Sequence, residues 1–174
     1  MRHFKAFTVA SLILLPFSAV AADWTGGYAG LQIGTSDIDT NVVVTGDGNS
    51  FGAFAGYNFD MGTTVVGGEM DYDTTDYTLT GGAGTIDSTL RLKGRVGGEI
   101  GPGLGYLSAG WVRAETSAFG DDTGYFYGIG YDMPVAPNTF AGAEILQHEF
   151  ENFGRAAGPD VSMMTIKLRV GFQF

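Results

Sequence analysis

The sequence predicts an all-β protein, an eight-stranded antiparallel up-and-down transmembrane β-barrel preceded by a cleaved signal peptide. Three observations predict this class. The last residues of the chain alternate strictly between apolar and polar side chains over about eleven positions, the length of a transmembrane β-strand. Glycine occurs 29 times, which suits a tightly curved sheet better than helices. The first residues have the pattern of a secretory leader.

The leader begins with a short basic segment, Met1 to Lys5, and continues with an apolar stretch over residues 6–17. Small residues follow, and we expect cleavage beside Ala21 or Ala22. The apolar stretch is too short to cross a bilayer as a helix, and it has no polar face that would fit an amphipathic helix. We therefore expect a signal peptide over residues 1–22 and a barrel domain over residues 23–174. The chain has no cysteine, so disulfides are excluded.

Eight strands are predicted, at about 24–34, 50–59, 64–74, 87–100, 104–114, 124–133, 139–149 and 162–174. Three joins are tight, at 60–62, 101–103 and 134–138. Four joins are longer and polar, at 35–49, 75–86, 115–123 and 150–161. The two kinds alternate, as the short periplasmic turns and longer outer loops of outer-membrane barrels do. An even strand number then predicts that both termini are periplasmic.

The first strand runs from Trp24 to Gly34, and no facing is assigned to it. The next three strands each carry an apolar face, listed as Phe51, Tyr57 and Phe59; Val66, Met70 and Tyr72; and Leu90, Leu92, Val96 and Ile100. Their other faces hold small, polar or charged residues, listed as Gly52, Phe54, Gly56 and Asn58; Glu69, Asp71 and Asp73; and Arg91, Lys93, Arg95 and Glu99. Period-two alternation of this kind predicts strands with one face in an apolar medium.

The last four strands follow the same rule. The fifth has the least regular pattern, and we expect Leu107, Ala109 and Trp111 to point outward. The sixth alternates Tyr125, Tyr127, Ile129 and Tyr131 with Phe126, Gly128, Gly130 and Asp132. The seventh places Glu144 inward. The eighth alternates Met164, Ile166, Leu168, Val170, Phe172 and Phe174 with a face that carries Lys167 and Arg169.

Aromatic residues on the apolar faces decide which face is outside. They gather at two levels, listed as Tyr57, Phe59, Tyr131, Phe172 and Phe174 at one and Phe51, Tyr72, Trp111 and Tyr125 at the other. These levels match the two interfacial girdles of a barrel in lipid. The alternative is a soluble barrel of the lipocalin type, whose apolar faces would line a ligand cavity. The girdles and the terminal Phe174 favour the membrane.

Several short segments, in order, resemble the small eight-stranded outer-membrane β-barrel family, which includes alphaproteobacterial porin-like surface antigens and the OmpA-like transmembrane domain. They are residues 24–34, 67–69, 91–97 and 111–115. The resemblance implies an assembly signal for the barrel-assembly machinery in the last strand, at Lys167, Phe172 and Phe174. The family often has glycine where Arg169 stands. Unlike OmpA itself, the chain is expected to have no peptidoglycan-binding domain after the barrel.

The inward faces predict a charge network in the lumen, because eight strands leave room only for side chains and buried charges must pair. Its expected members are Glu69, Asp71, Arg91, Lys93, Arg95, Glu99, Glu144, Lys167 and Arg169, with Asp73 and Asp132 also pointing in. Strand heights predict contacts between Glu69 and Arg95, and between Glu144 and Arg169 or Lys167. The network is either a static polar plug or, as the OmpA resemblance implies, a gate.

Three features suggest other chemistry but are incomplete. His148, four residues after Glu144, could serve a lipid hydrolase, but no serine nucleophile accompanies it, and we expect it at the outer rim. Residues 37–41 begin like a calcium loop, but Val42 and Gly48 stand where glycine and glutamate are needed. Residues 101–105 only superficially resemble a phosphate loop. We expect no catalytic residue, cofactor or metal.

The net charge of the chain limits the classes of partner that it can bind. Nineteen acidic residues face nine basic ones, for a net charge of −10, and the outer joins are acidic. Such a surface argues against nucleic-acid binding. We expect outer-membrane lipid and lipopolysaccharide as partners, with Arg113 placed to contact lipid phosphates, and a monomer. The sequence predicts a structural, surface-exposed protein of the cell outer membrane that supports envelope integrity, or alternatively a narrow gated pore for ions or very small solutes.

Overall fold

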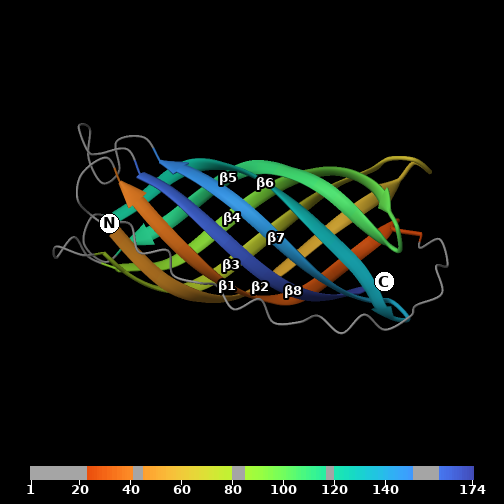
Figure 1. Cartoon of the computed structure of the whole chain (residues 1–174), viewed down its shortest axis with the longest axis horizontal. Coiled ribbons are helices and arrows are strands. Elements are labelled where there is room, and N and C mark those ends of the chain that lie inside the picture. The colour runs from red at the N-terminus through yellow and green to blue at the C-terminus, as the bar shows by residue number, and fades with distance from the viewer. Residues whose placement is uncertain (1–22, 41–44, 80–84, 117–119, 151–160) are drawn as a thin grey trace, which may run out of the picture.

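The computed structural model describes residues 23–40, 45–79, 85–116, 120–150 and 161–174. Its eight strands form one closed antiparallel barrel in sequence order, in which β1 pairs with β8 (Figure 1). The strands are β1 (Gly26–Thr40), β2 (Thr45–Asp60), β3 (Val65–Leu79), β4 (Thr85–Ile100), β5 (Gly103–Thr116), β6 (Gly120–Ala136), β7 (Thr139–Phe150) and β8 (Val161–Gln173). The predicted fold class and strand number are confirmed. No helix among the described residues has the length and apolarity of a membrane span.

One end of the barrel holds the three tight joins, at residues 61–64, 101–102 and 137–138, and we call it the tight-turn end. Gly101 and Asn138 have φ of 62° and 57°, the left-handed conformation that such turns need. The two ends of the described chain meet here as well. The Gln173 side chain donates to the carbonyl of Asp23 at 2.8 Å, and the Phe174 amide donates to Gly27 at 2.8 Å.

Seven of the eight strands are longer than the sequence predicted, and β8 has the 13 residues expected of it. They contain between 12 and 17 residues, whereas about 9–11 suffice to cross a bilayer. Most of the difference lies at the far end, opposite the tight turns, where residues assigned to polar joins continue the ladders: β1 reaches Thr40 and β2 begins at Thr45. At the tight-turn end, β6 continues to Ala136, so the tight join expected at 134–138 is reduced to residues 137–138. The expected alternation of long and short joins is therefore wrong in part, since β5 and β6 are separated only by residues 117–119. A sheet that extends beyond lipid needs no apolar face, so alternation could not reveal it.

The predicted facing of the strands is confirmed. Side chains assigned to the outside are exposed, apart from Val66, Tyr131 and Ile166, which are half-buried. On β5, Leu107 and Trp111 are exposed, while their neighbours Tyr106, Ser108 and Val112 are buried. Each strand thus separates an apolar outer face from an inner face of mixed character.

Glycines on the inner face make room for aromatic rings of the adjacent strand. Tyr28 lies across from Gly56 on β2, and Tyr106 lies across from Gly130 on β6. A Cβ on Gly56 would come within 2.6 Å of Tyr28 Cζ, and one on Gly130 within 2.5 Å of Tyr106 Cε2. The abundance of glycine follows from this close approach of ring to backbone.

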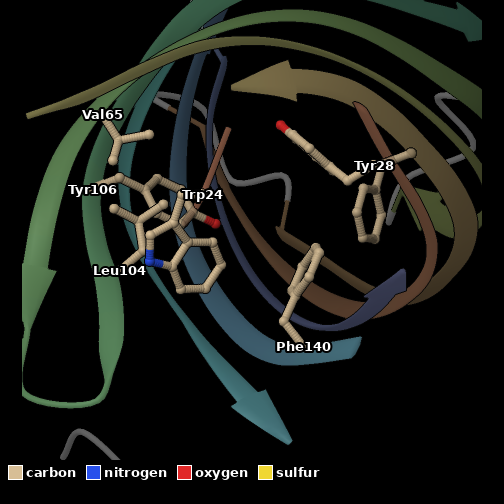
Figure 2. Close-up of a cluster of buried hydrophobic side chains, with 7 residues drawn as sticks. Trp24, Tyr28, Val65, Leu104, Tyr106 and Phe140 are labelled. Carbon is tan, nitrogen blue, oxygen red and sulfur yellow. The ribbon is translucent and has the colours of Figure 1, made fainter. Parts of the chain in front are cut away.

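Two apolar clusters close the lumen. The one at the tight-turn end consists of Trp24, Tyr28, Phe54, Val65, Leu104, Tyr106 and Phe140, and Figure 2 shows its side chains projecting into the interior. The Trp24 and Phe140 rings meet edge to face, with centroids 6.3 Å apart. The second cluster, towards the far end, consists of Val112, Ala114, Phe126, Leu146, Phe150 and Met163.

Candidate functional site in the lumen

A charged layer lies between the two apolar clusters. Ten ionisable side chains from five strands, each at most 5% exposed, make up this layer, which we call the lumen network. Its carboxylates are Glu69, Asp71, Asp73, Asp132 and Glu144, and its cations are Arg91, Lys93, Arg95, Lys167 and Arg169. The two signs balance. Net neutrality is the condition under which so many charges can be buried together.

Lys93 lies at the centre of the network. Its ammonium Nζ is 2.6 Å from Glu69, 3.1 Å from Asp71 and 2.9 Å from Glu144. These three carboxylates have oxygens within 4.8 Å of one another, an arrangement that could hold a cation. The ammonium of Lys93 neutralises them instead, so the cluster is an ion-pair centre in which one lysine connects acids of β3 and β7.

Among the carboxylates of the network, Glu69 has the largest number of partners. Besides Lys93, it contacts Arg95 at 3.2 Å and Arg169 at 3.0 Å, and the Tyr28 hydroxyl donates to it at 2.9 Å. The predicted contact of Glu69 with Arg95 is thus present. Arg169 also lies 3.4 Å from Glu144, the other predicted contact.

The two arginines of this group are also stacked on aromatic rings. The guanidinium of Arg95 lies 3.7 Å from the centroid of Tyr106, and that of Arg169 lies 3.8 Å from the centroid of Phe54. A planar guanidinium can stack in this way and still donate in its own plane, which an ammonium cannot do. The structure therefore gives Arg169, at the position where glycine was expected from the family resemblance, both ion pairs and a ring contact.

Lys167 and Arg91 extend the network towards the far end. Lys167 Nζ lies 2.7 Å from Asp73 and 3.4 Å from Asp71, and Arg91 also pairs with Asp73. Lys167 is opposite Glu144 in the register, but their charged atoms are not paired in the described structure. The alternative partner that the sequence allowed for Glu144 is therefore not used, because Asp71 and Asp73 are closer to the ammonium.

His148 corrects a second expectation. It is fully buried rather than at the outer rim, since β7 continues beyond it to Phe150. Its Nε2 accepts a hydrogen bond from Arg91 Nε at 2.9 Å, and its Nδ1 faces the Met163 carbonyl at 3.4 Å. Neither partner is a nucleophile, and the carboxylate of Glu144 binds Lys93 and Arg169 instead. The described contacts thus assemble no Glu–His pair for hydrolysis.

Glu99 is the one expected member outside the network. It occupies an inward position of β4, but it is exposed because it lies beside the turn at 101–102. This position is nearer the tight-turn end than the apolar cluster that closes the lumen there. Without Glu99, and with Asp73 and Asp132 included, the network contains five carboxylates and five cations. The ring and hydroxyl partners Tyr28, Phe54 and Tyr106 were not expected in the site. The alternation of side chains on β1 and β5 could have identified Tyr28 and Tyr106 as inward-facing.

The girdle residues lie on the outer surface. Phe51, Tyr57, Phe59, Tyr72, Trp111, Tyr125, Phe172 and Phe174 are exposed, and Tyr131 is half-buried. Tyr131 donates its hydroxyl to the Ile100 carbonyl at 2.8 Å. The ring of Phe174 lies over Gly27, where a Cβ would come within 2.7 Å of Phe174 Cε2.

The other candidate sites fall elsewhere. Asp37 to Thr40, the start of the calcium-like segment, belong to β1 rather than to a loop, and residues 41–44 lie outside the described residues. The expected cleavage residues Ala21 and Ala22 lie outside them as well. Residues 101–102 form the β4–β5 turn, with no helix after them.

Comparison with known proteins agrees with this geometry. The family model described as outer membrane protein beta-barrel domain matches residues 7–174. The 25 kDa outer-membrane immunogenic protein of Brucella abortus is 26% identical over 213 residues, with both chains covered completely, and that of Brucella melitensis is 25% identical over 213 residues with the same coverage. The crystal structure of Neisserial surface protein A superposes with a TM-score of 0.61 at 15% identity, over 86% of this chain and 98% of that one.

Proposed function

Because the chain belongs to the outer membrane protein β-barrel domain family and is an outer-membrane protein, we propose that it is a non-enzymatic structural barrel of the envelope. Its strands anchor it in the membrane, its far end presents short surface segments outside, and its lumen is closed. The curated relatives named as immunogenic outer-membrane proteins are consistent with a surface-exposed role.

The observation that carries this proposal is the filling of the lumen. Ten buried charges of balanced sign lie between two apolar clusters, and Glu69 alone holds three cations. A passage for solutes would require several of these pairs to separate at once in a site of low dielectric, where each broken pair costs about 3–5 kcal/mol.

Planar-bilayer recording tests the closed lumen directly. We expect the purified, refolded protein to insert without steady conductance, and a deletion strain to become more sensitive to detergent than its parent. Steady, reproducible channels from the wild-type protein would contradict the structural proposal and support a pore.

A narrow gated pore is the second candidate, and one observation favours it. Lys93 lies at comparable distances from carboxylates on two strands, so exchange of its partners needs little movement. In addition, Ser50, Thr89 and Arg91 each have a buried polar atom without a hydrogen-bond partner in the described structure. Such atoms favour hydration of the lumen towards the far end.

We also propose that the tight-turn end faces the periplasm, with both termini there. Even strand number and short turns at one end support this orientation. The chain has no cysteine, so Met61→Cys in a tight join and Glu115→Cys near the far end of β5 give two clean labelling sites. A membrane-impermeant maleimide should label intact cells only at position 115. Labelling at position 61 alone would reverse the orientation.

Two further proposals concern assembly. The barrel-assembly machinery engages β8 through Lys167, Phe172 and Phe174, and the barrel acts as a monomer. Lys167 is fully buried in the lumen network and the two phenylalanines lie outside, so only the phenylalanines are accessible on the finished barrel. Cross-linking in the membrane should give no ladder of multimers of this chain.

A further inference from the structure

The outer face of β4, β5 and β6 is hollowed between the two girdles. Two adjoining depressions of about 580 and 680 Å³ share Gly94, Ala109 and Tyr127 in their lining. Leu92, Trp111 and Tyr125 border the first on the side of the far end, and Val96, Leu107 and Ile129 border the second towards the tight turns. We call the two together the β4–β6 groove.

The floor of the β4–β6 groove is formed by small residues in register. Gly94 pairs with Ala109, and these two residues lie in the lining of both depressions. Gly68 of β3 pairs with Gly94 beside the floor, and the large, exposed Tyr127, which pairs with Ala109, bounds it on β6. A Cβ on Gly94 would meet only the Ala109 carbonyl oxygen, at 3.8 Å, so the space above the floor is open rather than filled by a neighbouring side chain. The floor is therefore lower than the rows of large apolar residues on either side of it.

A cation stands above this groove on the same strand face. Arg113 is exposed, two residues beyond Trp111 and four beyond Ala109 on β5. Of the six basic residues that the structure describes, the other five are buried in the lumen network. At about 3.3 Å per residue, Arg113 is about 13 Å along the strand from Ala109, which an extended acyl chain can span.

We propose that the β4–β6 groove seats one acyl chain of lipopolysaccharide, whose phosphate is bound by Arg113. The groove lies within the apolar band, where an acyl chain is the available ligand, and the guanidinium at its far end has the charge and geometry for a phosphate. The proposal rests on the outward orientation of the far end given under Proposed function, because lipopolysaccharide occupies the outer leaflet.

Native mass spectrometry of the protein folded in detergent micelles and titrated with rough lipopolysaccharide tests the site. Ala109→Leu fills the floor, and Arg113→Gln removes the charge. Ala55→Leu is the matched control, since Ala55 is an exposed, outward alanine of β2 away from the groove. We expect about tenfold weaker binding for Ala109→Leu and for Arg113→Gln, and no change for the control. Each variant is first shown to fold by its boiling-dependent shift in SDS gels.

Two results would overturn the proposal. One is wild-type affinity in Ala109→Leu, or equal losses in Ala109→Leu and Ala55→Leu, which would remove the groove as the seat. The other is phosphatidylglycerol binding as tightly as lipopolysaccharide with the same dependence on Arg113, which would indicate any anionic lipid. Cysteine labelling at positions 61 and 115 tests orientation independently, so its failure is distinguishable from failure of the site.

Discussion

At the scale of the residue, burial rather than charge decides what each acid does. Glu69 and Glu99 both stand at inward positions, on the neighbouring strands β3 and β4. Glu69 is buried against Lys93, Arg95 and Arg169, while Glu99 is exposed beside a turn. Alternation assigns both to the same face, and only the height at which the lumen closes separates them.

This contrast predicts a large difference between two identical substitutions. Glu69→Ala removes one acid from three buried cations and should destabilise the barrel by about 3–5 kcal/mol, whereas Glu99→Ala should change its stability by less than about 0.5 kcal/mol. The temperature at which the folded band converts to the unfolded band in SDS gels measures both. Equal conversion temperatures for the two variants would show that the network does not stabilise the barrel.

Removing the central lysine should convert the ion-pair centre into a cation site. Lys93→Ala leaves Glu69, Asp71 and Glu144 close together without the ammonium, and hard oxygen ligands of this kind suit calcium. We expect the variant to be destabilised in EDTA and to recover part of the loss in calcium. The wild-type conversion temperature should be the same in both, and a variant unaffected by calcium would contradict the prediction.

At the scale of the element, ring and glycine on adjacent strands act as one packing unit. The ring of Tyr106 on β5 lies over Gly130 on β6, and the guanidinium of Arg95 is stacked on the same ring. Gly68 on β3 faces outward and has open space beyond its Cα. Glycine therefore has two effects. On the inner face it makes room for a ring of the adjacent strand, and on the outer face it leaves a depression.

Two valine substitutions test this unit. Gly130→Val places its side chain within the Tyr106 ring and should cost about 1–3 kcal/mol or prevent closure, since overpacking forces the backbone apart. A Cβ on Gly68 would meet nothing closer than 4.0 Å, so Gly68→Val should fold normally. The folded fraction after refolding into detergent measures each. Normal folding of Gly130→Val would show that Tyr106 can leave its position freely.

The end of β8 provides a test of assembly. Phe174 is 74% exposed, and its ring lies over Gly27, so its removal should cost little stability in the finished barrel. We expect Phe174→Ala to lower the amount of folded protein in the outer membrane severalfold while the refolded protein keeps its conversion temperature. Ile100→Ala, at another exposed apolar strand end, is the control. Unchanged levels of Phe174→Ala in the membrane would argue against the assembly role.

At the scale of the whole molecule, the barrel is layered along its axis. An apolar cluster, a neutral charged layer and a second apolar cluster succeed one another from the tight-turn end, and each layer draws side chains from strands far apart in sequence. Lys93 of β4 and Glu144 of β7, 51 residues apart, meet only because the sheet closes. Closure and charge pairing therefore depend on one another.

The sequence alone determined the class, the number of strands and the facing of the strands whose side chains alternate clearly, because lipid outside and a crowded lumen inside impose a strict period of two. It also determined that Glu69 would contact Arg95, since neighbouring strands with tight turns fix relative height. The tertiary structure decided the rest. Strand length beyond lipid, the burial of His148, the exposure of Glu99 and the position of Lys93 among three acids all depend on the stagger with which the barrel closes and on where the apolar clusters end. Those quantities are properties of the whole sheet, and the alternation of side chains within a single strand does not predict them.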